Sequence, residues 1–489
     1  MRRFGIHKLL LFAIVAAVLL SPAQAFAQAP YTGYIWNNQG DARSINGYLY
    51  YDSIDGYDMA SGPFNAPEDL FIDQNDHLYV VDSGNNRIVK MDNEKKVLRT
   101  IGDESGPGQL NGPKGIYVKK DGTIYVSDTL NRRIAIFSAE GKFLQELKAP
   151  SSPLLGKSFI YSPSKLTVDK RNYLLIASDG GSEGLLQIDA KGEFKGFYGA
   201  NHVGFSWQRL FIKTFATSEQ RQQLARVRPT EFSNLHQDQE GFMYTTTLGV
   251  QTNQIKRLSA VGVDTLNSSP KEYGDLFTAG SVFEVPAFSD LTVDNKGVIT
   301  AIDQANGKAF QYDKLRNLLF VFGGLGEQNG LFKTPVAIDQ TSDGTIYILD
   351  KAMNRISLFR TTPFADLVHQ ASALYVDGRY AEAMEPWNKV LELNSNYDLA
   401  YNAIGKALFK AEKYKEAMMY FRLGRSQYDY SLALREHRKE YMRQHFTIIV
   451  VCLIAIYLLL KFGVRLVRSK WKQSRAVPYE SVTKNGGRA

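Results

Sequence analysis

A repeated phrase of two short strands and a polar turn constrains the fold of this chain more than any other feature. Its clearest copy begins at Pro67, ends its second apolar run at Asp82 and closes its turn with Arg87. A second copy starts at Pro113, 46 residues after Pro67, and places Asp128 46 residues after Asp82. A period of about 40–50 residues with several short strands per unit is typical of propeller arrays. The sequence therefore predicts an all-β array, a fold that usually offers a binding surface and specifies no reaction.

Further units begin near Pro163, Glu231, Pro286 and Pro335, which makes six in total. In three units an aspartate is followed five residues later by an arginine: Asp82 and Arg87, Asp128 and Arg133, Asp350 and Arg355. Asp303 and Lys308 have the same offset. A carboxylate after a strand accepts hydrogen bonds from the N–H groups of a turn, and a basic residue at the end of that turn is able to pair with it. We predict a structural role for these blade-turn residues; the alternative is a ring of charges that recognises a ligand.

The phrase resembles the NHL repeat in its turns, Asn86-Arg87, Asn131 with Arg133, and Asn354-Arg355. The resemblance covers roughly residues 60–360 and implies a six-bladed β-propeller, which we place at residues 31–362. Each unit is expected to contribute four strands. Unit six ends at Phe359 without a fourth strand, so Tyr48-Leu49-Tyr50-Tyr51 is predicted to close the ring and remove its open edge. Units three and four depart from the pattern at Gly180-Gly181 and Thr245-Thr246-Thr247.

One insertion interrupts the repeats at about residues 205–228. Its apolar residues have helical spacing and form a candidate interaction surface: Trp207, Leu210, Phe211 and Phe215. Packing of this stripe against the propeller is the plainer interpretation, and a partner-docking surface or a lid over the channel are the alternatives.

From Phe364 the pattern becomes helical and repeats after 34 residues, as in Ala371 and Gly405 or Ala383 and Ala417. This resembles the tetratricopeptide repeat, whose period is 34. The resemblance implies two helical hairpins over residues 364–430, and we expect a capping and linking helix over 431–445. Pro386 lies inside one predicted helix and is expected to kink it.

Both ends of the chain have features typical of export and membrane anchoring. Residues 1–27 combine basic residues, an apolar run and Ala-x-Ala sites, which predicts a signal peptide; an uncleaved anchor is the alternative. Residues 446–464 are long and apolar enough to span a bilayer, and the basic tail at 465–489 predicts a cytoplasmic C-terminus.

The only cysteine, Cys452, lies in that span, so the exported part has no disulfide. Much of the net charge of +8 belongs to the tail, and we therefore expect no nucleic-acid partner.

No catalytic, cofactor-binding or metal-binding motif emerges from the sequence. Similar propellers include lyases and metal-dependent lactonases, so the resemblance leaves open a hydrolase or lyase with a metal ion in the channel. The histidines of the repeat region, His77, His202 and His236, do not occupy equivalent positions. A calcium site built from channel carboxylates stays open, as does carbohydrate binding through the many tyrosines.

The fold class expected from the sequence is therefore multidomain: an all-β six-bladed propeller, all-α hairpins and one transmembrane helix. The expected function is that of a protein-interaction scaffold or sensor outside the cytoplasm, accessory to a membrane complex. Its protein partners would bind through the propeller face and the groove of the helical repeats.

Overall fold

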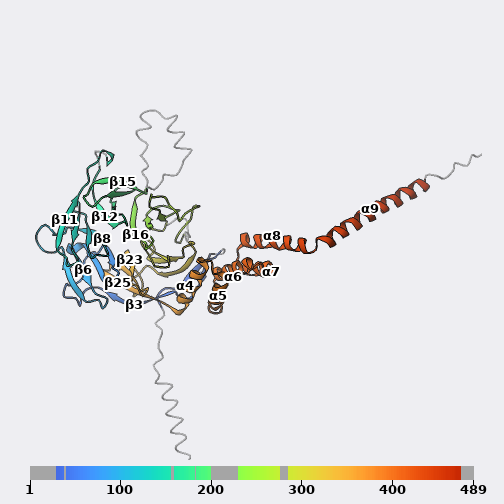
Figure 1. Ribbon diagram of the computed structural model, residues 1–489. Helices are drawn as coiled ribbons and strands as arrows, with labels where there is room; N and C mark the ends of the chain where they lie inside the picture. The colour runs from blue at the N-terminus through green and yellow to red at the C-terminus, as the bar shows by residue number, and fades with distance from the viewer. Residues whose placement is uncertain are drawn as a thin grey trace, which may run out of the picture. The chain divides into compact units, whose positions relative to one another are not determined.

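The repeats form six antiparallel sheets arranged as the blades of a β-propeller (Figure 1). The computed structural model describes residues 29–37, 40–155, 159–181, 183–199, 230–275 and 285–474. The chain separates into two units, Met1–Tyr397 and Asp398–Ala489. Among the described residues, the first unit contains the propeller and two α-helices, and the second contains the α-helices that follow.

Each blade is built from strands that follow one another in sequence, with the first strand of each unit innermost. Blade 1 contains β4 (Asp69–Ile72), β5 (Leu78–Asp82), β6 (Arg87–Met91) and β7 (Val97–Ile101), and blade 2 contains β8 (Pro113–Val118), β9 (Ile124–Asp128), β10 (Arg133–Phe137) and β11 (Phe143–Lys148). Blade 3 contains β12 (Pro163–Val168), β13 (Leu174–Ser178), β14 (Leu185–Ile188) and β15 (Phe194–Tyr198), and blade 4 contains β16 (Phe232–Gln237), β17 (Met243–Thr247) and β18 (Ile255–Leu258). Blade 5 contains β19 (Phe288–Val293), β20 (Ile299–Asp303), β21 (Lys308–Tyr312) and β22 (Leu318–Gly323), and blade 6 contains β23 (Pro335–Gln340), β24 (Ile346–Asp350) and β25 (Arg355–Thr361).

Blade 6 is completed by β3 (Tyr48–Ile54), which pairs with β25 in antiparallel register from Tyr48 opposite Thr361 to Ile54 opposite Ile356. The predicted closure by Tyr48–Tyr51 is thus confirmed. The preceding segment forms a separate hairpin from β1 (Tyr34–Asn37) and β2 (Gly40–Arg43).

Blade 4 differs from the prediction of four strands per unit, because its sheet has three strands within the described residues. A loop takes the place of the fourth strand along β18. Thr265 N–H donates to Arg257 O at 2.7 Å, and Asn267 Nδ2 donates to Ile255 O at 2.8 Å. The outer edge of β18 is therefore hydrogen-bonded without a strand, which protects it from pairing with another chain.

Apolar side chains fill the spaces between adjacent blades. Leu70 and Val80 of blade 1 pack with Leu349 and Ile356 of blade 6 and with Ile54 of β3. Similar clusters join blade 1 to 2, 2 to 3, 3 to 4 and 4 to 5. Full burial of one such side chain stabilises the fold by about 1.5–3 kcal/mol. The second strands β5, β13 and β24 are buried along their whole length, and their sequences are nearly continuous apolar runs rather than alternating patterns.

The first unit ends in two helices, α4 (Pro363–Val376) and α5 (Tyr380–Leu393), which pack against each other. Thr362 caps α4 by accepting a hydrogen bond from Ala365 N–H at 3.2 Å, and Pro363 occupies the first turn, where its missing N–H costs nothing. α5 continues through Pro386 as one helix.

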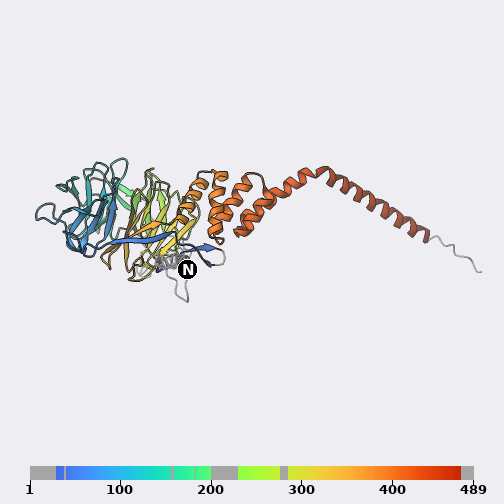
Figure 2. The ribbon, with the colours of Figure 1, turned by 90° about the horizontal axis from the view of Figure 1, so that it is seen from below.

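The second unit contains α6 (Asp398–Lys410), α7 (Tyr414–Leu423), α8 (Gln427–Gln444) and α9 (Phe446–Ser474). A Cβ added to Gly405 of α6 would lie 2.7 Å from the ring of Phe421 in α7, so the small residue of the 34-residue pattern does permit close helix packing. α9 is one continuous helix in both views (Figures 1 and 2). It contains a stretch, Phe446–Lys472, that is long and apolar enough to cross a membrane, and an 18-residue window in it has a mean hydropathy of 2.6. The helix is longer than the predicted span of residues 446–464.

Candidate functional site

The blade turns of units one and two place the predicted Asp–Arg pairs in direct contact. Asp128 Oδ2 accepts hydrogen bonds from Arg133 Nε at 2.7 Å and Asn131 Nδ2 at 2.8 Å, while its Oδ1 accepts from Asn111 N–H at 2.8 Å. Asp128 is fully buried. Arg133 also donates to Gln109 O. The pair therefore binds a backbone N–H and a backbone carbonyl of the segment that leads into the inner strand.

Asp82 repeats this geometry in blade 1. It accepts from Arg87 Nε at 2.8 Å, Asn85 Nδ2 at 2.8 Å and Asn65 N–H at 2.7 Å. Asn86, one residue before Arg87, has a left-handed backbone with φ of 54°, a conformation that asparagine tolerates better than most residues. Its side chain accepts a hydrogen bond from Gly112 N–H of the next blade at 2.7 Å. The repeated turn residues therefore hold the blades together.

In units five and six the predicted pairing of the aspartate with the basic residue five positions later does not form. Asp350 accepts from the N–H groups of Lys333 and Met353, but Arg355 contacts Asn329 Oδ1 at 3.2 Å and pairs with no carboxylate among the described residues. Lys308 likewise pairs with Asp275 at 2.6 Å and not with Asp303. In these units the aspartate bonds to backbone N–H groups while the basic residue has a different partner.

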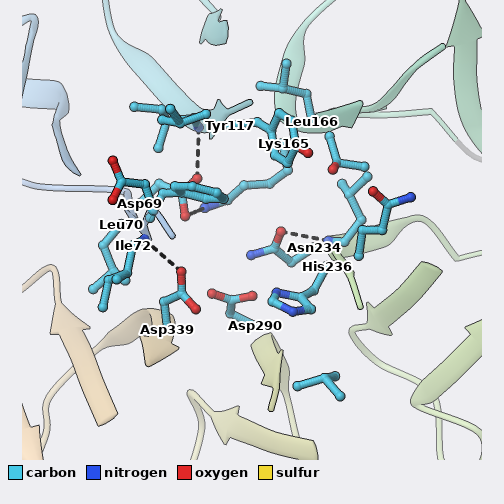
Figure 3. A pocket seen from close by; sticks show the side chains of 18 of the residues that line it. Asp69, Leu70, Ile72, Tyr117, Lys165, Leu166, Asn234, His236, Asp290 and Asp339 are labelled. Carbon is cyan, nitrogen blue, oxygen red and sulfur yellow. Dashed lines mark hydrogen bonds and ion pairs between the residues drawn. The ribbon is translucent and has the colours of Figure 1, made fainter. Parts of the chain in front are cut away.

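The inner strands bring a second polar set together around the central channel. One register position on each inner strand is occupied in turn by Asp69, Gly115, Lys165, Asn234, Asp290 and Ala337. Two residues further along, the same strands carry Phe71, Tyr117, Thr167, His236, Thr292 and Asp339. Most of these residues line one cavity of about 290 Å³. Figure 3 shows the carboxylates of Asp69, Asp290 and Asp339 pointing into the same space as Lys165, Asn234 and His236.

Three of these aspartates bridge neighbouring blades. Asp69 Oδ2 accepts from Ile116 N–H at 3.1 Å, Asp290 Oδ2 from Ile338 N–H at 2.8 Å, and Asp339 Oδ2 from Ile72 N–H at 2.8 Å. In each case the donor belongs to the inner strand of the next blade.

Lys165 crosses the channel from blade 3 to blade 1. It pairs with Asp69 Oδ1 at 2.7 Å and donates to Glu68 O at 3.1 Å. Most acceptor positions of the channel carboxylates are therefore engaged within the fold.

Burial dominates the electrostatics of the channel. It raises the pKa of Asp339 to about 6 and raises the pKa of Asp290 well above its usual value; the nearby Asp69 carboxylate adds to the second shift. Burial also raises the pKa of Asp69, although Lys165 opposes that change. Burial lowers the pKa of His236 to about 4. Carboxyl groups with raised pKa values beside a neutral imidazole in one cavity are typical of functional sites. Structural networks of ion pairs cause pKa shifts of the same kind.

Sequence reasoning did not identify this channel set. His236 lies near the end of β16 and faces the cavity. His77 Nδ1 lies 3.0 Å from Asp73 Oδ2, and His202 lies outside the described residues. The available signal was a charged residue in the middle of an inner strand, as at Asp290 or Lys165. In the described residues, no three side chains of the His, Cys, Asp and Glu types form a group that could hold a metal ion.

A second polar network attaches α4 to blade 5. His369 Nε2 lies 2.6 Å from Gln311 Oε1, and Gln311 Nε2 donates to Tyr48 Oη at 2.8 Å. Ser372 Oγ donates to Asp313 Oδ2 at 3.3 Å. Burial and, secondarily, Lys296 lower the pKa of His369 to about 4, so it is neutral at neutral pH and Nε2–H is able to donate to Gln311. The helical pair is therefore an integral part of the first unit.

The opposite side of this pair forms an open groove of about 390 Å³. Its rim holds two exposed ion pairs, Arg379 with Glu382 and Lys389 with Glu385. Its lining residues are Leu367, Gln370, Leu374, Arg379, Glu382, Glu385, Pro386 and Lys389.

The candidate interaction surface of Trp207, Leu210, Phe211 and Phe215 lies outside the described residues, as do the predicted signal peptide and the end of the basic tail after residue 474. These predictions stay as they were drawn from the sequence.

Comparison with known proteins identifies one repeat directly. Residues 64–91 match the family model of the NHL repeat. The chain carries an NHL repeat. No curated protein matches the chain.

Among solved structures, a streptogramin B lyase is similar at 15% identity with a TM-score of 0.39, covering 60% of this chain and 78% of that one. Virginiamycin B lyase from Staphylococcus aureus is similar at 10% identity with a TM-score of 0.40, covering 64% of this chain and 100% of that one. A candidate gluconolactonase is similar at 14% identity with a TM-score of 0.38, covering 61% of this chain and 89% of that one. Such distant likeness transfers no activity to this chain.

Proposed function

We propose that this protein is a membrane-anchored interaction scaffold or sensor whose rigid first unit presents the groove of α4 and α5 to a protein partner. The observation that carries the proposal is the attachment of α4 to blade 5 through His369, Gln311 and Ser372. Because α4 is fixed by buried hydrogen bonds on one side, its groove side offers a preformed surface, which reduces the entropy lost on binding. The 34-residue spacing supports tetratricopeptide-type hairpins as the source of this groove.

Anchoring is proposed through α9, with the first unit outside the cytoplasm. The apolar stretch of α9 and the basic residues that follow it support a single span with a cytoplasmic C-terminus. Cysteine labelling tests the orientation: in a Cys452→Ser background, Ser342→Cys is expected to react with a membrane-impermeant maleimide in intact spheroplasts. Ser469→Cys is expected to react only after permeabilisation. The reverse pattern contradicts the proposed orientation.

Site-specific photocrosslinking in intact cells tests the scaffold function. A photoreactive amino acid at Leu374, in the groove, is expected to capture a defined membrane-associated protein. The same amino acid at Leu144, an exposed position on β11 outside the groove, serves as the control. Capture of no protein at Leu374, or of the same set at both positions, would refute groove-mediated binding.

A metal-dependent hydrolase or lyase of the lactonase type is the second candidate. The polar cavity that Asp290, Asp339, Asn234 and His236 share favours a ligand in the channel, although no three His, Cys, Asp or Glu side chains of the described residues form a metal-binding group there. Elemental analysis of the purified full-length protein distinguishes the two candidates. One equivalent of calcium or zinc that is lost in Asp290→Ala would support the enzyme, and a metal-free protein with an active groove would support the scaffold.

A further inference from the structure

Basic side chains follow one face of the C-terminal part of α9. Lys461, Arg465, Arg468 and Lys472 are spaced by four, three and four residues within the continuous helix. At about 100° per residue, these positions fall within an arc of about 60°. We call these four residues the basic stripe.

The rest of this segment is largely apolar. Four exposed apolar residues lie on the other sides of the helix: Phe462, Leu466, Val467 and Trp471. Lys470 is the one basic residue between 461 and 472 that points away from the stripe, because it lies about 180° from Lys461 around the axis. An amphipathic segment with a cationic face and aromatic residues on its other side fits the interface of a membrane with anionic lipids.

The length of α9 places this segment at the interface. Its 29 residues extend about 44 Å at 1.5 Å per residue, whereas the hydrocarbon core of a bilayer is about 30 Å thick. The uncharged residues from 446 to 460 start the helix, so the excess length falls at the basic end.

We propose that the basic stripe binds the headgroups of anionic phospholipids at one membrane surface. This inference rests on the proposed membrane span of α9. Arg468 and Lys472 lie beyond the first 30 Å or so of the helix, at headgroup depth, and the long side chains of Lys461 and Arg465 extend toward the same surface. The apolar residues beside them contact the acyl boundary, so phosphate groups pair with one side of the helix. A Lys or Arg near an anionic surface contributes about 1 kcal/mol, a factor of about five in affinity.

The test uses the full-length protein in phosphatidylcholine vesicles with and without phosphatidylglycerol. Electron spin resonance of spin-labelled lipids measures the preference of the protein for phosphatidylglycerol over phosphatidylcholine. Lys472→Gln, on the stripe, is expected to lower that preference about fivefold, whereas Lys470→Gln, two residues away but on the other side, is expected to lower it less than twofold. The fourfold variant with Gln at positions 461, 465, 468 and 472 is expected to lose the preference, and high salt is expected to weaken it in the wild type.

Equal losses of lipid preference in Lys472→Gln and Lys470→Gln would overturn the proposal, because they would show that total charge alone sets the preference for phosphatidylglycerol. A fourfold variant that retains the preference would show that the stripe faces solvent or a protein. Alkaline extraction is performed first on every variant. If the wild-type chain is extracted from the vesicles, both the membrane span and this inference fail; if it resists extraction but shows no lipid preference, only this inference fails.

Discussion

The buried pair of Asp128 and Arg133 makes the most direct test of how the repeated turn stabilises the propeller. In Asp128→Asn, the side-chain oxygen is still able to accept from Asn111 N–H. The new amide group, however, points hydrogens at Arg133 Nε and Asn131 Nδ2, which are themselves donors. The substitution thus exchanges two favourable contacts for two donor–donor contacts inside a blade from which water is excluded.

The expected loss of unfolding free energy is about 3 kcal/mol. Breaking a buried ion pair by removing one partner costs about 3–5 kcal/mol, and Arg133 retains a second carboxylate, Glu146, at 2.8 Å, which places the estimate at the lower end. Asp350→Asn is the matched control. Asp350 is equally buried and accepts from backbone N–H groups, but it has no basic partner among the described residues, so the loss there is about 1 kcal/mol.

Thermal unfolding followed by the β-sheet circular dichroism signal measures the difference. For a sheet domain of ~330 residues, the entropy of unfolding is about 0.7 kcal/mol/K. The midpoint should therefore fall by about 4 °C in Asp128→Asn and by about 1.5 °C in Asp350→Asn. Because the pair is buried, the difference should persist at high salt. Equal decreases in the two variants would refute the reasoning, since they would show that the turn N–H bonds account for the effect and the arginine contributes nothing.

Three further predictions concern other parts of the chain. Burial raises the pKa of Asp339 to about 6, so the folded state holds that proton more tightly than the unfolded state. The free energy of unfolding should therefore fall by up to about 3 kcal/mol as the pH rises from 4 to 6. The thermal midpoint of Asp339→Asn should depend less on pH across this range. Gly405→Ala should destabilise the second unit by about 1–3 kcal/mol through its clash with an aromatic ring of α7, whereas Gly463→Ala, which meets nothing, should leave the helical signal unchanged or more stable. Ile54→Ala in β3 should cost about 2–4 kcal/mol of propeller stability in urea unfolding, while Tyr57→Ala, at an exposed side chain, should cost almost nothing; a silent Ile54→Ala would contradict the closure of blade 6.

The period of the repeat was sufficient to predict the propeller and its closure. A unit that ends at Phe359 leaves its blade one strand short. The missing strand had to come from the segment before the first unit, where Tyr48 to Tyr51 have strand-forming side chains. Blade 4 could not be predicted in the same way. Its missing strand is replaced by the hydrogen bonds of the Thr265 backbone N–H and the Asn267 side chain. Such loop contacts carry no periodic sequence signal.

The partners of individual charges were harder to predict than the strands that carry them. A five-residue offset fixes the distance between Asp and Arg along the chain, but an arginine has enough reach to choose another acceptor. Arg355 contacts Asn329, and Lys308 contacts Asp275. Both alternatives come from neighbouring segments whose positions depend on the whole blade. The channel set was missed for a related reason, since its members meet only after all six inner strands surround one axis.

The two sets of buried aspartates in the propeller are maintained by opposite physical effects. Asp82 and Asp128 pair with arginine and accept hydrogen bonds from several N–H donors, so the turn uses both oxygens of each carboxyl group. Burial makes the charged form of Asp290 unfavourable, and sister blades place Gly115 and Ala337 at the same register position. A blade therefore folds without an acid at that position. The bridge from Asp290 to Ile338 N–H explains how the acid is tolerated in the channel, but the fold alone does not require it. Sites where a local rule is broken without a structural need are where function is expected, which is why metal content is the measurement that separates the two proposed functions.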